Sequence, residues 1–296
     1  MTAQEPEHDH APQQRIRAVL GEVPETALWT LHHRAVEARR PDTVLPDPKA
    51  VELVDRIDYP FTERFGPDGG LAGQIQALRV GCFDREVADF LARCPGGTVV
   101  CLGDGLETQY WRVDNGRARW LSVDLPEAVA LREQLLPAAP RQRLLACSAT
   151  DPAWLDEVDD SRGVLITAQG LLMYLRPTEV RDLVARCAER FPDGTFVLDA
   201  VPRWFARLAS RGRLRSRGWT APPMPWGMDA DEQPKLASAH PAVTEIRDVL
   251  PAGGRGVVGA LLPYAARIPL VSAARPSVVA LRFSARAGRP AGPVSA

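Results

Sequence analysis

The feature that most constrains the fold is a series of short apolar segments that alternate with helical patterns through the middle of the chain. The segments are rich in β-branched residues, and amphipathic stretches separate them. This alternation is typical of parallel strands that helices cover on both faces. It predicts a doubly wound, mostly parallel α/β sheet with strands over 98–105, 119–124, 143–149, 163–170 and 195–201.

The sequence before this core predicts a helical cap. Residues 25–40 carry apolar side chains at helical spacing and stop before Pro41, and a second helix is predicted over 46–57 with a proline in its first turn. A third helix is predicted over 76–94, after a glycine-rich turn. The first fourteen residues are polar and acidic and lack the pattern of a secretion signal, which predicts a disordered lead-in.

The sequence after the core predicts a substrate lid and the elements that complete the sheet. Residues 202–232 are basic, aromatic and proline-rich and fit no regular element, 243–251 resembles a helix, and 276–285 resembles an edge strand. The predicted organisation is a lead-in (1–14), a helical cap (15–96), an α/β core (97–201), a lid (202–245), a completion of the core (246–285) and a disordered tail (286–296).

Composition excludes several classes of function. The chain has 36 basic and 37 acidic residues, so no overall field favours nucleic acid or an anionic membrane. No run of 18 apolar residues occurs, which argues against a membrane span. The five cysteines contain no CxxC pair, so neither a metal site nor a disulfide framework is indicated. We therefore expect a cytoplasmic protein that binds no metal, nucleic acid or membrane.

The residues that follow the first two predicted strands point to a nucleoside ligand. Open parallel sheets bind ligands at the carboxyl ends of their strands, and Gly103-Asp104-Gly105 follows the first. Thr108 replaces the third glycine of a dinucleotide fingerprint, which favours a cofactor without phosphates. Asp124 lies 21 positions after Gly103, near the offset at which an acid binds ribose hydroxyls. A helix cap before Pro126 is the alternative interpretation of Asp124.

The next two strand ends carry further polar residues. Ser148 and Ala149 end the third strand, where they would border an adenine ring or, equally well, cap a short helix. Gln169 and Gly170 end the fourth strand, so an amide would face the ligand. Tyr174 follows them and either points into the same cleft or packs in the core.

Four segments together carry a resemblance to a known family. They are RVGCFD (79–84), VVCLGDGLETQYWRV (99–113), SVDLPE (122–127) and TAQGLLMYLRPTEV (167–180). The chain resembles the leucine carboxyl methyltransferase family, especially its bacterial branch of tetracenomycin-type polyketide O-methyltransferases. Residues 25–48 and 224–232 resemble the same branch, and the similarity spans roughly 25–285.

This resemblance implies a class I methyltransferase fold that binds S-adenosylmethionine. By position, Arg79 would pair with the carboxylate of the methionine moiety, and Asp124 would bind the ribose hydroxyls. Gln169 stands where many relatives have Glu, which predicts a weaker contact with the amino group. The residues expected to bind the cofactor are Arg79, Gly103, Asp104, Gly105, Asp124, Leu125, Ser148, Ala149, Gln169 and Gly170.

The resemblance also implies residues for catalysis and for the acceptor. Tyr174 matches a tyrosine near the transferred methyl group, and His33 and Arg34 match a basic pair on a helix above the site. His32 and His33 point about 100° apart on such a helix, so one of them would face the site, and either could equally be a packed side chain. Arg203 or Arg207 would bind an acidic group of the acceptor. The residues expected to bind the acceptor are Arg34, Arg203, Trp204, Trp219 and Trp226.

The predicted function is methyl transfer to an oxygen of a small molecule, such as an aromatic polyketide made as a secondary metabolite. A carboxylate acceptor is already ionised near neutral pH, whereas a phenol benefits from a base or a nearby cation. Two alternatives remain open: a methyltransferase for the C-terminal carboxyl group of a protein or peptide, and a cofactor-binding scaffold without catalysis. The chain would act as a monomer or a homodimer.

Overall fold

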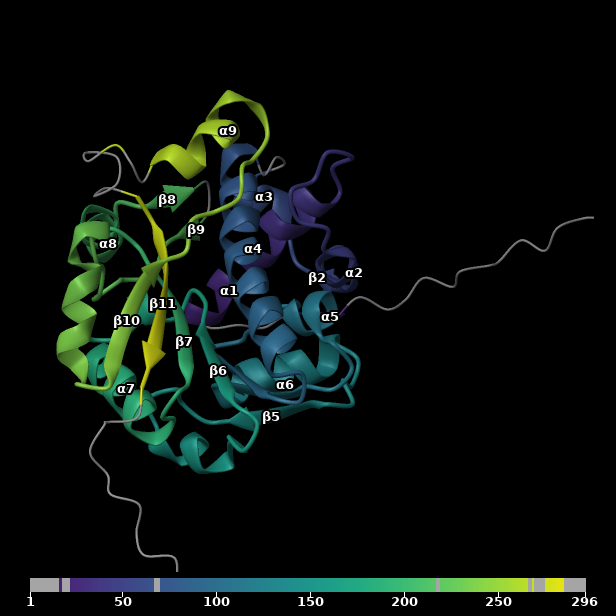
Figure 1. The fold of residues 1–296 in the computed structure, drawn as a ribbon. Helices are drawn as coiled ribbons and strands as arrows, with labels where there is room; N and C mark the ends of the chain where they lie inside the picture. Colours follow the sequence, from purple (N-terminus) through teal and green to yellow (C-terminus); the bar gives the residue numbers. More distant parts are fainter. Residues whose placement is uncertain are drawn as a thin grey trace, which may run out of the picture.

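A seven-stranded sheet forms the centre of the molecule (Figure 1). The computed structural model describes residues 16–17, 22–66, 70–216, 219–265, 268 and 275–284. The strand order is β10-β11-β7-β6-β3-β4-β5, in which β11 runs antiparallel to both neighbours and the other pairs are parallel. The strands are β3 (Thr98–Leu102), β4 (Arg119–Asp124), β5 (Gln142–Ala146), β6 (Val164–Ala168), β7 (Thr195–Ala200), β10 (Val243–Asp248) and β11 (Ser277–Phe283). The predicted doubly wound, mostly parallel sheet is confirmed.

Helices cover both faces of the sheet. The helices of the core are α5 (Gln109–Val113), α6 (Pro126–Leu135), α7 (Pro177–Arg190) and the 3₁₀ segments η1 (Pro152–Glu157) and η2 (Leu172–Tyr174). All five residues of β3 and of β6 are buried, because side chains that alternate between the two faces of a parallel strand meet helices on each. Within the described residues, no helix is both long and apolar enough to cross a bilayer.

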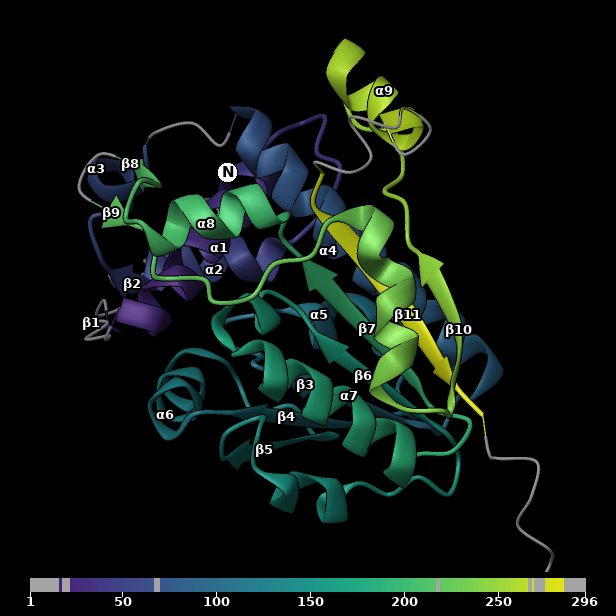
Figure 2. The same ribbon diagram turned by 90° about the vertical axis from the view of Figure 1, so that its left-hand side faces the viewer.

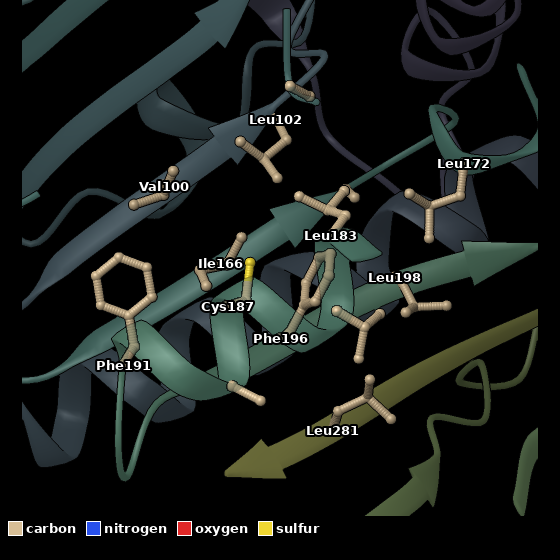
Figure 3. Packing of buried hydrophobic residues seen from close by; sticks show 14 of the residues in the cluster. Val100, Leu102, Ile166, Leu172, Leu183, Cys187, Phe191, Phe196, Leu198 and Leu281 are labelled. Carbon is tan, nitrogen blue, oxygen red and sulfur yellow. The ribbon is translucent and has the colours of Figure 1, made fainter. Parts of the chain in front are cut away.

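The larger apolar core lies between the sheet and α7. Val100, Leu102 and Ile166 point from the central strands toward Leu183 and Cys187 of α7, as Figure 3 shows. On the opposite face the alternate residues of the same strands, among them Val99 and Leu165, pack with Phe83 and Phe90 of the long helix α4. The two cores fix the direction of the strands and therefore the place where their carboxyl ends meet.

The N-terminal helices form a cap over the carboxyl ends of the parallel strands (Figure 2). They are α1 (Glu22–Ala38), α2 (Pro48–Arg56), α3 (Phe61–Phe65) and α4 (Gly70–Arg93), and the two-residue strands β1 (Ile16–Arg17) and β2 (Ile57–Asp58) pair beside them. Asp47 begins α2 by accepting a hydrogen bond from the Ala50 amide, with Pro48 in the first turn. Leu28 and Leu31 of α1 pack on Leu53 of α2, so the cap has an apolar core of its own.

Three predictions for the C-terminal third were wrong. The segment predicted as a helix over 243–251 is largely strand β10, because Val243 and Ile246 also fit a strand and the chain pairs with β11. β11 is not an edge strand, since it lies between β7 and β10. The lid also contains regular elements: α8 (Arg203–Ser210), β8 (Arg215–Ser216), β9 (Trp219–Thr220) and the 3₁₀ segment η3 (Ala230–Ala239), followed by α9 (Gly256–Ala265) beyond β10.

Candidate active site

A cavity of about 900 Å³ lies between the cap and the carboxyl ends of the parallel strands. β3 pairs with β4 on one side and with β6 on the other, so the strand order reverses at β3, where a doubly wound sheet opens a crevice. Residues of the loops after β3, β4 and β6 line one side of this cavity, and α1, α8 and β9 contribute the other. The cavity is large enough for a cofactor together with a small second ligand.

The loop after β3 brings backbone rather than side chains to the cavity. Gly103 and Gly105 have φ angles of 64° and 44°, a left-handed conformation that side chains disfavour. A Cβ atom on Gly103 would lie 2.9 Å from Cδ1 of Leu171. Both glycines line the cavity. Because they carry no side chain, the backbone of this turn can come close to a ligand, as predicted.

We expect Gly103→Ala to lower the free energy of unfolding by about 1 to 3 kcal/mol, because it adds left-handed strain and a contact with Leu171. It should also weaken cofactor binding. Gly116→Ala is the matched control, since Gly116 has φ 74° but open space around its Cβ position. Chemical unfolding and calorimetric titration would measure both effects, and equal cofactor affinity in the two variants would contradict a ligand role for the turn.

Asp124 connects the ends of β4 and β3. Its Oδ2 accepts a hydrogen bond from the Gly105 amide at 2.6 Å, and its Oδ1 accepts one from the Leu125 amide at 2.8 Å. Burial raises the pKa of this carboxyl above its ordinary value, although the two amide bonds oppose the shift. Asp124 and Leu125 both line the cavity, as the prediction that they bind the cofactor requires.

Asp104 stabilises the turn after β3 through contacts with other protein side chains. Its Oδ2 accepts a hydrogen bond from the Ser122 hydroxyl at 2.6 Å and lies 3.0 Å from a guanidinium nitrogen of Arg132. Burial raises the pKa of Asp104 to about 6, against the opposing effect of Arg132. Asp104 lines the cavity as predicted, but its carboxylate is engaged by the protein, so we assign it to holding the turn.

A buried ion pair orients Arg79. Nη1 of Arg79 lies 2.5 Å from Oδ2 of Asp199 in β7, and Oδ1 of Asp199 accepts a hydrogen bond from the Gly170 amide at 2.7 Å. Nε of Arg79 is buried and has no partner among the described residues, so it can still donate to a carboxylate. Asp199 was not among the predicted site residues, although it stands near the end of a predicted strand, as Asp124 does.

Glu107 lies at the centre of a buried cluster of charges beside the cavity. Its Oε1 accepts hydrogen bonds from Arg34 at 3.0 Å and Arg112 at 2.7 Å, and its Oε2 accepts one from Nε2 of Gln169 at 3.0 Å. The two arginines lower the pKa of Glu107 to about 2 against the effect of burial. Because Glu107 is ionised and accepts only, the amide nitrogen of Gln169 faces it, and the amide oxygen of Gln169 remains available for a ligand.

The same cluster changes the role of Arg34. This side chain is buried, and besides Glu107 its guanidinium donates to Asp47, to the Thr108 hydroxyl and to the Leu106 carbonyl, each at 2.8 Å. Arg34 therefore fastens α1 and α2 to the loop after β3. That Arg34 binds the acceptor stays a prediction, because Arg34 lines the cavity and its Nε has no partner among the described residues, while its other two guanidinium nitrogens are engaged by the protein.

His33 and Tyr174 both reach the cavity. His33 is 4% exposed, and its Nδ1 has no hydrogen-bond partner within the described part of the chain. Burial, assisted by the nearby His32, lowers the pKa of His33 to about 4, so the ring is neutral at pH 7. Burial raises the pKa of Tyr174, while a hydrogen bond with Thr26 opposes the shift. A neutral imidazole facing a cavity can accept a proton, as a catalytic base must.

The pKa of His33 predicts a pH dependence of stability. Its pKa falls from 6.5 in the unfolded chain to about 4 in the folded protein, so below pH 6.5 the unfolded state binds the extra proton. The contribution of neutral His33 to the free energy of unfolding is therefore fully present at pH 7 and is lost as the pH falls toward 4. We expect wild type to lose about 2 kcal/mol more than His33→Asn between pH 7 and pH 5, measured by urea unfolding. Equal losses in both proteins would contradict the assigned pKa.

The structure does not bring every predicted residue to the cavity. Ser148 and Ala149 follow β5, and neither lines it. Arg203 lies at the exposed start of α8, where its Nε donates to Glu232 at 2.5 Å, and Trp226 is buried in the core under the sheet. Neither Arg203 nor Trp226 lines the cavity, so the cavity does not support their predicted contact with the acceptor. The proline-rich segment gave no periodicity from which to place them. Trp204 and Trp219 do line the cavity.

Solved structures resemble this fold. A methyltransferase structure from Thermobifida fusca superposes with a TM-score of 0.53 at 18% identity, covering 86% of this chain and 94% of that one. The carbon methyltransferase CurJ superposes with a TM-score of 0.50 at 12% identity, covering 89% of this chain and 68% of that one. The fold, with its cavity at the reversal of strand order, is that of the class I methyltransferases, as predicted.

Sequence comparisons identify the family. A model of the leucine carboxyl methyltransferase family matches residues 27–188. The tetracenomycin polyketide synthesis O-methyltransferase of Streptomyces glaucescens is 35% identical over 208 residues, which are 70% of this chain and 75% of that protein. An S-adenosyl-L-methionine-dependent methyltransferase of Gibberella zeae is 32% identical over 57% of this chain and 61% of its own length. The chain belongs to the leucine carboxyl methyltransferase family, and the predicted S-adenosylmethionine-dependent methyltransferase activity is confirmed at that level.

Proposed function

We propose that this chain transfers a methyl group from S-adenosylmethionine to an oxygen of a small aromatic acceptor. The observation that carries the proposal is a single cavity in which nucleoside-binding loops face an aromatic wall. Gly103, Asp124 and Gln169 line one part, and Trp29, Phe205 and Trp219 line the other. Aromatic side chains supply flat, rigid apolar surface for a ring-containing ligand.

The described residues suit the cofactor. Asp124 would receive the ribose hydroxyls, the free Nε of Arg79 would donate to the carboxylate, and the amide oxygen of Gln169 would accept from the ammonium group. When bound, S-adenosylmethionine supplies the methyl group from a positively charged sulfur. The task of the protein is then to align the acceptor oxygen and to exclude water, which the cap over the cavity serves.

His33 is the proposed base for a phenolic acceptor. It is neutral at pH 7, and its unpartnered Nδ1 lies on a residue that lines the cavity, so it can accept a hydrogen bond from the phenol. Because the pKa of His33 is about 4, it would take the proton only as the bond between oxygen and methyl forms and the phenol becomes a much stronger acid. Tyr174 lines the same cavity and would help to shape the space around the transferred methyl group. An acceptor carboxylate would need no base, because it is already ionised near neutral pH.

Three observations favour a small-molecule acceptor over the C-terminus of a protein. The wall is aromatic, the cap covers the strand ends, and the Streptomyces glaucescens relative is named for polyketide synthesis. We place the reaction in the cytoplasm, where cysteines such as Cys82, Cys101 and Cys187, which are free in the structure, remain reduced.

The proposal is tested with S-adenosylmethionine that carries an isotope-labelled methyl group. The purified protein is incubated with aromatic phenols and aromatic acids, and in parallel with peptides that have free C-termini. We expect label in an aromatic product, and treatment with alkali distinguishes an ester, which loses the label, from an ether. Label that enters only the peptides, or no acceptor of either kind, would overturn the proposal.

A further inference from the structure

Charge is divided unevenly within the cavity. The carboxylates that line it all belong to the strand ends, on the side of the proposed cofactor, and they are Asp104, Glu107, Asp124 and Asp199. None of the described residues that line the opposite side, on α1, α8, β8 and β9, is acidic. A positively charged sulfur fits the first side. The second side lacks carboxylates that would repel an anion.

Arg215 is a cation on that second side that no carboxylate of the described residues neutralises. Three other arginines line the cavity, and each pairs with an acid: Arg34 with Glu107, Arg79 with Asp199 and Arg275 with Asp248. Arg215 in β8 instead donates through Nε to the Gly212 carbonyl at 2.7 Å, and no ion pair joins it to another described residue. Its guanidinium can therefore bind an external anion through the remaining N–H groups.

An aromatic stack lies beside Arg215. β8 and β9 pair as an antiparallel hairpin, with Arg215 opposite Thr220 and Ser216 opposite Trp219. Trp219 stacks on Trp29 of α1 with ring centroids 5.9 Å apart, and its edge meets Phe65 of α3 at 6.1 Å. Figure 2 shows this hairpin next to α3 and near the end of α8. Because Arg215 pairs with Thr220 and Trp219 pairs with Ser216, the exposed side chain of Arg215 and the ring of Trp219 leave opposite faces of the hairpin.

Trp219 adds a second donor. The indole Nε1 of Trp219 is buried and has no hydrogen-bond partner among the residues that the structure describes. A buried N–H group without a partner is destabilising, so such a group marks a place where a ligand oxygen can accept. Trp219 and Arg215 are four positions apart, line the same cavity and both offer donors.

We propose that the hairpin of β8 and β9 forms a subsite for an aromatic acceptor that carries an acidic group, with Arg215 binding the anion and Trp219 donating to a different oxygen of the same acceptor. The acceptor class is therefore aromatic acids, oriented with the anion at the hairpin and the reacting oxygen toward the strand ends. This assignment rests on the proposed function. It replaces Arg203, which Glu232 neutralises, and it gives a role to an arginine of the basic run 211–218.

The test compares hydroxynaphthoic acid with its neutral carboxamide. Each probe is titrated by calorimetry into the full-length protein saturated with S-adenosylhomocysteine, so the readout is binding rather than turnover. We expect wild type to bind the acid about 10-fold more tightly than the carboxamide, as a charge-assisted hydrogen bond allows. Arg215→Gln should reduce this ratio to about one, whereas Trp219→Phe, which keeps an aromatic ring, should weaken the binding of both probes alike and leave the ratio unchanged.

Arg213→Gln is the matched control, because Arg213 belongs to the same basic run, is exposed and does not line the cavity. Its acid-to-carboxamide ratio should equal that of wild type. An acid preference that survives Arg215→Gln, or that is absent in wild type, would overturn the subsite. Saturation with S-adenosylhomocysteine is checked first, and failure at that step would overturn the proposed function instead.

Discussion

Asp124→Ala should weaken the binding of S-adenosylmethionine by about 100-fold. The carboxylate at the end of β4 is positioned by two backbone amides, those of Gly105 and Leu125, and it lines the cavity. In the proposed complex, removing it deletes two charge-assisted hydrogen bonds to the ribose, and it loosens the turn after β3. Each such bond contributes about 1.5 to 3 kcal/mol, and 1.4 kcal/mol corresponds to a factor of ten in affinity. Calorimetric titration measures the change.

Two further variants isolate the effect of the Asp124 charge. Asp124→Asn keeps an oxygen for the Gly105 amide, so it should retain the turn and lose less affinity than Asp124→Ala. Asp151→Ala removes another strand-end aspartate, one that begins η1 by accepting a hydrogen bond from the Ala153 amide and does not line the cavity. Its affinity should match wild type. Wild-type affinity in Asp124→Ala would refute the assignment of Asp124 to the ribose.

Asp199→Ala should destabilise the fold by about 3 to 5 kcal/mol and also reduce cofactor affinity. Asp199 is 4% exposed, and its loss would leave the charge of Arg79 without a counter-ion and the Gly170 amide without an acceptor. Breaking a buried ion pair from one side is costly because the remaining charge stays desolvated. The free energy of unfolding in urea gives the first effect, and titration of the folded variant gives the second.

An exposed ion pair provides the comparison for Asp199. Asp160 lies 2.8 Å from Arg190, but both side chains are more than a third exposed, so Asp160→Ala should cost less than about 1 kcal/mol. Asp199→Asn should fall between the two alanine variants, since it keeps an acceptor for Gly170 and loses the charge. A destabilisation by Asp199→Ala no larger than that of Asp160→Ala would show that the buried pair does not hold this edge of the site.

The core of the fold was predictable because its strands are buried on both faces. β3, β4, β6 and β7 coincide with apolar runs in the sequence, and the helices between them carry clear periodicity. The wrong predictions of secondary structure fall in segments that lack a clear apolar or helical pattern. β10 is an edge strand with its side chains mostly exposed, so its few apolar residues fit a helix as well as a strand. The position of β11 inside the sheet depends on long-range pairing that a local pattern does not encode.

Site residues were predictable where they directly follow a strand. They were not predictable where their role depends on contacts with other side chains. Gly103, Asp124 and Gln169 were found from the loops that follow predicted strands. Asp199 and Glu107 were missed because their importance comes from arginines that they contact, of which Arg79 and Arg34 are far away in sequence and Arg112 is near. Glu107 did give one signal, as a charged residue two positions after Gly105. The structural contacts of Arg34 could not be predicted for the same reason, since its four partners lie on two segments, Asp47 before α2 and residues 106–108 after β3.

The most direct test of the account is a crystal structure of the protein with S-adenosylhomocysteine bound. We predict that the ribose hydroxyls lie within hydrogen-bond distance of Asp124, that the carboxylate of the ligand meets Arg79, and that its chain passes over Gly103 and Gly105. A nucleoside bound at another surface, or bound in this cavity without contacting either Asp124 or Arg79, would contradict the site assigned to the cofactor.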